Sequence, residues 1–175
     1  YNIYSESCLS SEGDVLLISC ERDQTYGEKD IYFCTLLPDS TWSEPKNIGN
    51  VANSFADEVG PFLAADGITM YFSSAGHPGY GKNDIFMTRR LDDTWTKWSE
   101  PKNLGPKVNT AKWDAYYTVP ASGKNAYLVS STPGAKTDIY RIKQSESAKP
   151  LPLAFVKGIV YNSETKKTMS TEITY

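Results

Sequence analysis

The chain has 175 residues and a net charge of −3, with 18 basic and 21 acidic residues, and 13% of its residues are aromatic. This balance excludes the basic surface of a nucleic-acid-binding protein and a polybasic membrane patch. Its apolar runs are too short for a membrane-spanning helix, which needs about 20 residues. The length suits about one domain. Because the sequence begins at Tyr1 without an initiator Met, we expect it to be part of a longer polypeptide.

The first predicted unit covers residues 1–52. A turn at Gly13 precedes an apolar run at 15–18, a polar loop precedes "DIY" at 30–32, and "WSEPKNIG" follows at 42–49. Runs rich in β-branched and aromatic residues, separated by turn residues, indicate short strands. No stretch shows helical periodicity. We therefore expect four short strands in this unit.

Three cysteines, Cys8, Cys20 and Cys34, lie in the first unit. They form no Cys-x-x-Cys motif, and their spacing to the single histidine, His77, does not fit a zinc site. We predict that they are small apolar fillers and that the chain binds no metal.

Two expected turns fix the register of these cysteines. A turn at residues 12–13 places Cys8 beside about Leu17, and a turn around residue 25 places Cys34 beside about Leu16. The two cysteines then flank the central strand at about 9–10 Å from each other. This separation exceeds disulfide reach.

The second unit covers residues 53–108 and repeats the pattern of the first. We expect strands at about 58–64, 68–74, 84–90 and 95–104, with a tight turn at Gly67. The polar loop at 76–83 contains His77 and Tyr80. The unit ends on "WSEPKNLG", which differs from its counterpart in the first unit by one Ile-to-Leu change.

The third unit, 109–146, has the turn at Gly123, the apolar run at 126–129 and "TDIY", but it lacks a "WSEP" segment. Residues 147–152 read as a linker. Residues 153–175 show a different pattern, with alternating strands around an "NSETKK" turn, and indicate the start of a second β module.

The three units repeat with a period of 54–56 residues. Asp30, Asp84 and Asp138 lie 54 apart, and Gly13, Gly67 and Gly123 lie 54 and then 56 apart. Four strands in each period are typical of a β-propeller blade. We therefore predict an all-β chain built of propeller blades, part of a larger propeller with further blades N-terminal to Tyr1.

The Trp-Ser-Glu-Pro segments fit the outermost strand of such blades. Pro45 and Pro101 cannot donate a ladder hydrogen bond, which favours an edge position. Trp42 and Trp98 are then expected to fill the gap between neighbouring blades at the outer radius.

Taken together, [KNT]-D-I-[YF], D-G-x-x-x-Y-F-S-S and W-S-E-P-x-N-[IL]-G resemble the TolB-like propeller repeats of OmpA-family outer-membrane lipoproteins. The resemblance covers about residues 1–146. "VKGIVYNSETKKTMSTEI" resembles the opening of a carboxypeptidase-regulatory-like β-sandwich. The resemblance implies a cell-envelope protein on the periplasmic side of the outer membrane, in some relatives associated with type IX secretion.

The recurring residues support a structural role better than catalysis. An enzyme needs one set of acids rather than one in each blade, so we expect Asp30, Asp84 and Asp138 to fix the loop before the third strand. The candidate binding residues are Tyr26, Tyr80, His77 and Trp113, and we predict no cofactor. The expected function is a non-catalytic protein-interaction scaffold with other envelope proteins as partners.

Two alternatives stay open from the sequence. Tyr and Trp residues on loops also suit a glycan- or peptidoglycan-binding propeller. A sialidase-like glycoside hydrolase is a further alternative, because paired carboxylates can come from distant blades. Against it, the Ser-x-Asp-x-Gly core of the sialidase Asp-box is missing, and the chain has only four arginines, at positions 22, 89, 90 and 141.

Overall fold

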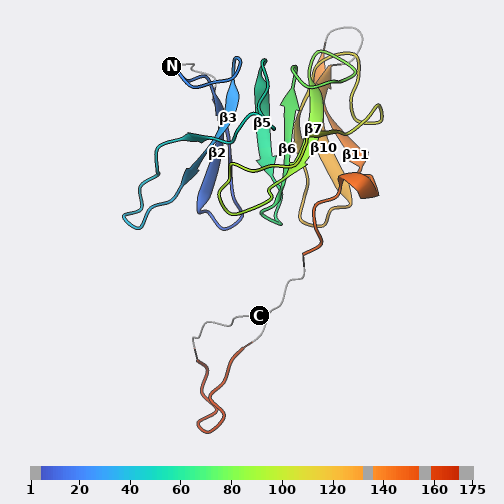
Figure 1. Cartoon of the computed structure of the whole chain (residues 1–175). Coiled ribbons are helices and arrows are strands. Elements are labelled where there is room, and N and C mark those ends of the chain that lie inside the picture. Colours follow the sequence, from blue (N-terminus) through green and yellow to red (C-terminus); the bar gives the residue numbers. More distant parts are fainter. Residues whose placement is uncertain (1–4, 132–135, 154–158, 170–175) are drawn as a thin grey trace.

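A computed structural model of the chain describes residues 5–131, 136–153 and 159–169, and these residues form an almost entirely β structure (Figure 1). Three antiparallel sheets follow one another along the chain. The first consists of β1 (Glu6–Leu9), β2 (Val15–Cys20), β3 (Asp30–Thr35) and β4 (Lys46–Asn47). The second consists of β5 (Glu58–Leu63), β6 (Thr69–Ser74), β7 (Asp84–Arg89) and β8 (Lys102–Asn103). The third consists of β9 (Asp114–Thr118), β10 (Asn125–Ser131) and β11 (Thr137–Lys143).

The first two sheets have the strand order of propeller blades, so the predicted all-β fold of four-stranded antiparallel blades is confirmed. Each strand pairs with the next one along the chain, and the apolar runs form the interior strands β2, β6 and β10. The third sheet has three strands in the described residues, in the order β11, β10, β9. The three sheets are called blades one to three from here on.

The fourth strand is shorter than the sequence indicated. We predicted that "WSEP" itself belongs to this strand, but regular pairing covers only the two residues Lys46–Asn47 or Lys102–Asn103. Outside this pairing, the tryptophan of each segment forms an isolated bridge. The proline between the tryptophan and the paired lysine interrupts the ladder because it has no N–H.

The serine of the motif replaces part of that ladder. The Ser43 hydroxyl accepts a hydrogen bond from the Thr35 N–H at 3.0 Å, and the Ser43 N–H donates to the Thr35 carbonyl at 2.9 Å. In the second blade Ser99 makes the same two bonds with Arg89, at 3.0 and 2.9 Å. The repeated Trp-Ser-Glu-Pro segment therefore ties the outer strand to the third strand where a continuous ladder is not possible.

The predicted register of the first blade is confirmed. Gly13, in the β1–β2 turn, has a φ of 78°, a conformation that glycine adopts without strain. The turn pairs Cys8 with Leu17, and the β2–β3 pairing sets Cys34 opposite Leu16. Gly67 and Gly123 take the same conformation, with φ of 66° and 61°, in the corresponding turns of the other two blades.

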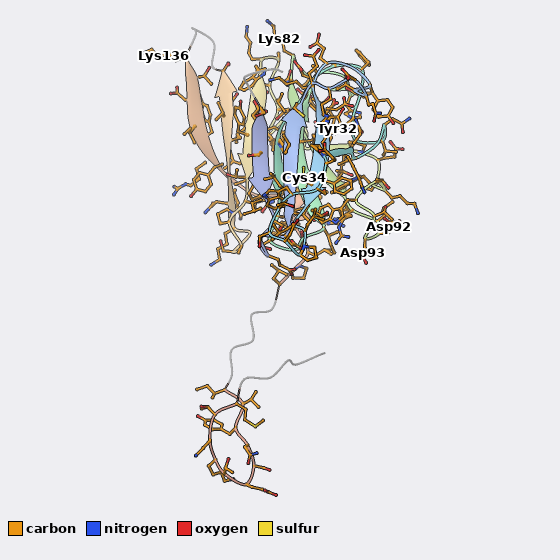
Figure 2. All side chains as sticks on the ribbon, turned by 90° about the vertical axis from the view of Figure 1, so that its left-hand side faces the viewer. Tyr32, Cys34, Lys82, Asp92, Asp93 and Lys136 are labelled. Atoms are coloured by element: carbon orange, nitrogen blue, oxygen red, sulfur yellow. The ribbon has the colours of Figure 1, made fainter. Side chains whose placement is uncertain are left out.

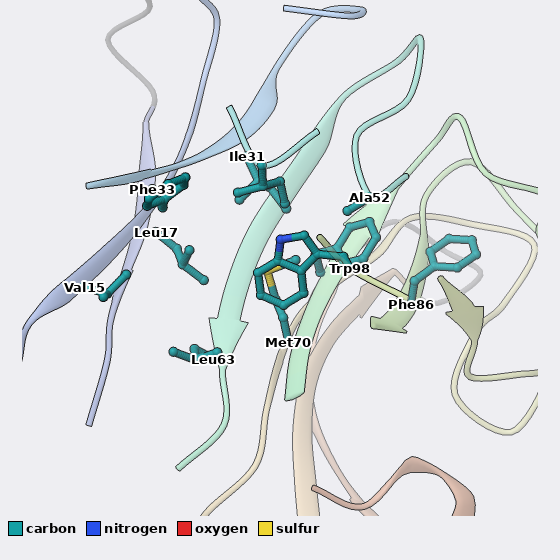
Figure 3. Close-up of a cluster of buried hydrophobic side chains, with 11 residues drawn as sticks. Val15, Leu17, Ile31, Phe33, Ala52, Leu63, Met70, Phe86 and Trp98 are labelled. Atoms are coloured by element: carbon teal, nitrogen blue, oxygen red, sulfur yellow. The ribbon is translucent and has the colours of Figure 1, made fainter. Parts of the chain in front are cut away.

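The blades stack side by side through apolar side chains (Figure 1), and their first strands, β1, β5 and β9, are neighbours in that order. Figure 3 shows the cluster between blades one and two, where Leu17, Phe33, Met70 and Trp98 meet. A second cluster, around Tyr71 and its neighbours on the opposite face of blade two, joins blades two and three; its other buried members are Ala64, Ile85, Met87, Tyr117, Val119, Ala126 and Leu128.

The segment after β11 lies at the lower end of blades two and three in Figure 1. It contains one turn of 3-10 helix, Glu146–Ala148, whose Ala148 carbonyl accepts the Tyr71 hydroxyl. Further on, Tyr161 and Thr168 form a bridge around the predicted "NSETKK" turn. The rest of the proposed β-sandwich segment, residues 154–158 and 170–175, lies outside the described residues.

Within the described residues, no helix is long and apolar enough to cross a membrane.

Candidate functional site

One end of the stack carries the longer loops and is called the loop face here. It consists of the β2–β3 and β6–β7 loops, residues 21–29 and 75–83, and of the crossovers from one blade to the next, residues 48–57 and 104–113. In Figure 1 this end is uppermost, and the short β1–β2, β5–β6 and β9–β10 turns lie at the lower end. All four predicted binding residues lie in or beside these loops.

The repeated aspartates hold the loops of this face. Asp30 accepts a hydrogen bond from the Tyr26 N–H at 2.9 Å, and Asp84 accepts bonds from the Tyr80 and Gly81 N–H groups at 2.5 and 3.1 Å. Both aspartates are buried. Asp30 and Asp84 thus bond the backbone of the β2–β3 and β6–β7 loops. Asp138 is exposed and pairs with Ser130, but the loop before it, residues 132–135, lies outside the described residues.

Two asparagines in each of the first two repeats extend this network, and the sequence analysis missed their role. In blade one the Asn47 amide donates to Asp30 at 2.6 Å, and the Asn53 amide donates to the Asn47 side-chain oxygen at 2.8 Å. Asn53 also accepts from the Ile31 N–H at 2.8 Å and donates to the Ile31 carbonyl at 3.0 Å. The crossover is thereby bound to the strand that it leaves.

Blade two repeats this network bond by bond. Asn103 donates to Asp84 at 2.8 Å, and Asn109 donates to Asn103 at 2.8 Å. Asn109 also bonds both backbone groups of Ile85, at 2.8 and 3.0 Å. A signal was present in the sequence, because Asn53 and Asn109 lie 56 residues apart, which is the period of the repeat.

Each loop also packs closely on the next crossover. A Cβ atom on Gly27 would collide with the backbone of Phe55, and one on Gly81 would collide with the Thr110 carbonyl. This close approach fixes Tyr26 and Tyr80 at the loop tips, where both are 54% exposed. Phe55, which the sequence analysis did not single out, is 76% exposed on the same face. The loop face therefore presents aromatic side chains on a hydrogen-bonded frame.

The inner strands carry a second polar and aromatic group. Glu6 in β1 accepts the Tyr116 hydroxyl at 2.8 Å and the Gly60 N–H at 2.8 Å, which connects the inner strands of all three blades. Burial, and secondarily the bond to Glu6, raises the pKa of Tyr116 to about 12. The Trp113 ring lies edge-on to Tyr116 at 5.6 Å. Trp113 thus belongs to the inner edge of the loop face.

His77 lies between blades one and two. Its ring Nε2 is 2.8 Å from the Ala52 carbonyl oxygen, and its ring centroid is 5.3 Å from that of Phe86 and 6.0 Å from that of Phe72. The sequence predicts His77 as a candidate binding residue in the polar loop 76–83. The structure gives it packing partners from both blades.

A buried acid begins the first strand of blades two and three. Glu58 has no exposed surface, and its carboxyl accepts the Ser54 and Ser74 hydroxyls at 2.5 and 2.6 Å and the Ser54 N–H at 2.7 Å. Burial raises the pKa of Glu58 to about 7, against the opposing effect of these bonds. Asp114 holds the equivalent position and accepts the Ser130 hydroxyl. Neither acid has a face open to a substrate.

Among the described residues, no three side chains of His, Cys, Asp or Glu gather in a way that suits a metal ion. The acids described above bond to hydroxyls, amides and backbone N–H groups instead. The described part of the loop face therefore offers aromatic surface, and its buried acids serve the frame.

Comparison with solved structures finds a protein whose fold is similar to that of this chain. The structure is similar to that of TolB from Acinetobacter baumannii, with a TM-score of 0.53 and 18% sequence identity. The fold is that of a TolB-like β-propeller. The similarity covers 78% of this chain and 29% of the TolB chain. No known family profile and no curated protein sequence matches the chain.

Proposed function

We propose that this chain is a non-catalytic protein-interaction scaffold of the bacterial cell envelope, and that it contacts its partners through the loop face. In the finer form of the proposal it belongs to an OmpA-family lipoprotein on the periplasmic side of the outer membrane, associated with type IX secretion. The TolB-like fold and the repeat motifs support the envelope setting.

The observation that carries the proposal is the exposure of aromatic residues on a rigid frame. Phe55, Tyr26 and Tyr80 project from loops whose backbones are held by buried Asp and Asn side chains. Aromatic residues are enriched at protein interfaces because they bury much area at little conformational cost. A preorganised frame lowers the entropy lost on binding.

The burial and hydrogen bonding of the acids support the non-catalytic part of the proposal. Glu58, whose pKa is raised to about 7, would suit a general acid by that value alone. Its two oxygens, however, accept three hydrogen bonds inside the contact between blades one and two, and its side chain has no exposed surface. It therefore cannot reach a substrate without opening the blades.

Site-specific photo-crosslinking tests this proposal. A photoreactive phenylalanine analogue at position 55 is compared with the same residue at position 91, because Leu91 is 65% exposed at the opposite end of the blades. The probe is a periplasmic and outer-membrane extract of a Gram-negative bacterium. We expect a discrete crosslinked protein from position 55 and none from position 91.

Two further assays separate the alternatives. Co-sedimentation with purified peptidoglycan that is lost in Tyr26→Ala and Tyr80→Ala, without a crosslinked protein, would replace the protein partner by a glycan. Hydrolysis of a chromogenic glycoside that disappears on substitution of a single acid would overturn the non-catalytic role.

A further inference from the structure

A cavity of about 520 Å³ lies at the end of blades two and three that carries the β5–β6 and β9–β10 turns, opposite the loop face. One wall is the β9–β10 turn, residues 119–123. Another is the segment after β11, residues 144–153, which is called the strap here. Arg89 at the end of β7 and Asp66 of the β5–β6 turn also line the cavity. Its volume falls within the range of small-molecule sites, about 300–1,000 Å³.

Hydrogen bonds hold the strap against blade two. The Gln144 amide donates to the Tyr71 hydroxyl at 3.1 Å and to the Ala148 carbonyl at 2.8 Å. Further along, the Leu151 N–H donates to the Asp66 carboxylate at 2.7 Å. Both Gln144 and Ala148 are buried. This wall of the cavity is therefore a docked part of the structure.

Three of the four charged side chains that line the cavity have partners. The Asp66 carboxylate accepts four hydrogen bonds, from three backbone N–H groups and the Thr69 hydroxyl, at 2.7 to 3.0 Å. Glu146 and Lys149 pair with each other at 2.6 Å. These groups leave little charge for a ligand to neutralise.

Arg89 is the fourth charged group. Its Nη2 donates to the Lys149 carbonyl at 3.3 Å, and its Nε is buried without a hydrogen-bond partner. Within the described ranges, no carboxylate lies at salt-bridge distance from its guanidinium. A guanidinium binds a carboxylate through two parallel N–H···O bonds, and a partly buried cation without such a partner is costly. The cavity therefore presents a cation suited to an anionic ligand.

The repeat does not require an arginine at this position. The equivalent residue is Thr35 in blade one and Lys143 in blade three. The adjacent Arg90, by contrast, is paired with Asp93 at 2.6 Å. The half-buried arginine is thus specific to blade two, where it lines the cavity.

The rest of the lining is mostly apolar. Its apolar members come from both walls: Val119, Pro120 and Ala121 of the turn, and Pro150, Leu151, Pro152 and Leu153 of the strap. The prolines have a fixed φ, which limits the conformations of both walls. An apolar lining around one guanidinium favours a ligand that has an apolar body and a single carboxylate.

We propose that this cavity binds a monocarboxylate with an aliphatic body and that Arg89 is its anion-binding residue. The carboxylate accepts hydrogen bonds from the Nη groups of Arg89, while the β9–β10 turn and the strap surround the aliphatic body. A free aliphatic acid and the C-terminus of a peptide that ends on an aliphatic residue share this chemistry. The inference goes beyond the scaffold function, because the cavity and the loop face lie at opposite ends of the blades.

An NMR titration with matched probes tests the site. The probes are hexanoate, N-acetyl-alanyl-leucine and, as the control without a carboxylate, N-acetyl-alanyl-leucinamide. We expect saturable shifts of the backbone amide signals of Ala121, Gly123 and Leu151 with both carboxylates, and at least about tenfold weaker binding of the amide. Tighter binding of the dipeptide supports a peptide C-terminus as the ligand, and tighter binding of hexanoate supports a free acid. Absence of saturable shifts, or equal binding of the dipeptide and its amide, overturns the proposal.

Variants of Arg89 separate its charge from its geometry. Arg89→Gln removes the charge, whereas Arg89→Lys keeps the charge and loses the planar fork. Arg141→Gln removes an exposed charge on β11 and serves as the control. We expect a loss of dipeptide affinity of at least about tenfold in Arg89→Gln, a smaller loss in Arg89→Lys, and a change within about twofold in Arg141→Gln. Undiminished binding in Arg89→Gln contradicts the assignment.

Hydrogen exchange of the Leu151 N–H reports whether the strap stays docked in these variants. Unchanged protection in Arg89→Gln, together with the loss of binding, assigns the effect to the guanidinium. If the Leu151 N–H loses its protection there, the comparison of the dipeptide with its amide on the unmodified chain still decides the proposal.

A carboxylate of the same polypeptide is the competing occupant. Outside the described residues the acidic side chain of this sequence is Glu172, and we expect the sequence to belong to a longer polypeptide. The titration is therefore repeated on Glu172→Gln and on the full natural polypeptide, where we expect dipeptide affinities within about twofold of that of the 175-residue chain. Tighter binding after Glu172→Gln, or loss of binding in the full polypeptide, would show that its own carboxylate fills the cavity and would overturn the proposal.

Discussion

Blades one and two carry the same Trp-Ser-Glu-Pro-Lys-Asn segment in different surroundings. Trp98 is 3% exposed, because its ring lies in the contact between blades one and two and its indole N–H bonds the Trp95 carbonyl at 2.9 Å. Trp42 is 39% exposed, because no described segment stands in front of the outward face of blade one. Figure 2 is turned toward this side of the molecule, with Tyr32 and Cys34 labelled. The burial of a repeated residue thus depends on the neighbouring blade.

The interior strands show the same contrast. All six residues of β6 are buried, because blade two has a neighbour on each face. In β2 buried residues alternate with half-buried ones such as Leu16 and Ile18, which stand where Met70 and Phe72 stand in β6. Because β2 and β6 are both apolar on both faces, the sequence alone predicts the same burial for the two strands.

The largest effect is expected from truncating the two tryptophans. Trp98→Ala removes a buried ring and leaves a cavity, which costs about 3–5 kcal/mol of unfolding free energy. Trp42→Ala is expected to cost less than about 1 kcal/mol, because the ring is partly exposed. Urea unfolding followed by circular dichroism measures both values. Equal losses would mean that a neighbour covers Trp42 in solution, for instance a second copy of the chain.

The buried Glu58 gives the contact between blades one and two a pH dependence. Its pKa is raised to about 7 in the folded protein, above its ordinary value near 4.5, so the folded state retains a proton that the unfolded state releases. This contribution is fully present below about pH 4.5 and is lost as the pH rises through about 7, a change of about 3 kcal/mol. Glu58→Gln is expected to remove this dependence.

Unfolding free energies of the wild type and of Glu58→Gln between pH 5 and pH 8 test this expectation. The difference between the two proteins should shift in favour of the variant as the pH rises. A constant difference across this range would show that Glu58 keeps an ordinary pKa in the folded protein.

The asparagine network allows a comparison in which the two blades should agree. Asn53→Ala leaves both backbone groups of Ile31 without a side-chain partner, and Asn109→Ala does the same for Ile85. Each change is expected to cost about 2 kcal/mol, since buried polar groups lose their hydrogen bonds. The exposed Asn50 serves as a control, with an expected change within about 0.5 kcal/mol for Asn50→Ala. Unequal losses at positions 53 and 109 would contradict the equivalence of the blades.

Sequence reasoning recovers the features that are set locally. Turn glycines fix the hairpin register, so the neighbours of Cys8 and Cys34 could be predicted from the position of Gly13. The period of the repeat gives the four-stranded sheets, and the interior strands follow from their apolar runs. The proline indicates an edge, although the way in which Ser43 replaces part of the ladder was not foreseen.

Features that depend on the next blade are not recoverable in this way. The His77 ring contacts the Ala52 carbonyl where blades one and two meet, and nothing in the sequence of the His77 loop indicates that partner. Phe55 escaped attention because the equivalent position in the next repeat, Ala111, is not aromatic. The roles of Asn53 and Asn109 depend on a crossover bending back onto its own blade, a long-range arrangement that turn propensity alone does not specify.

The two end surfaces of the stack have a consequence for symmetry. The face of blade one that looks away from blade two carries Leu16 and Ile18, whereas the face of blade three that looks away from blade two carries Tyr127 and Val129. Because these surfaces differ, a contact between them cannot be isologous and does not yield a two-fold dimer. Copies joined in this way form a ring if the rotation per copy closes, and a filament if it does not.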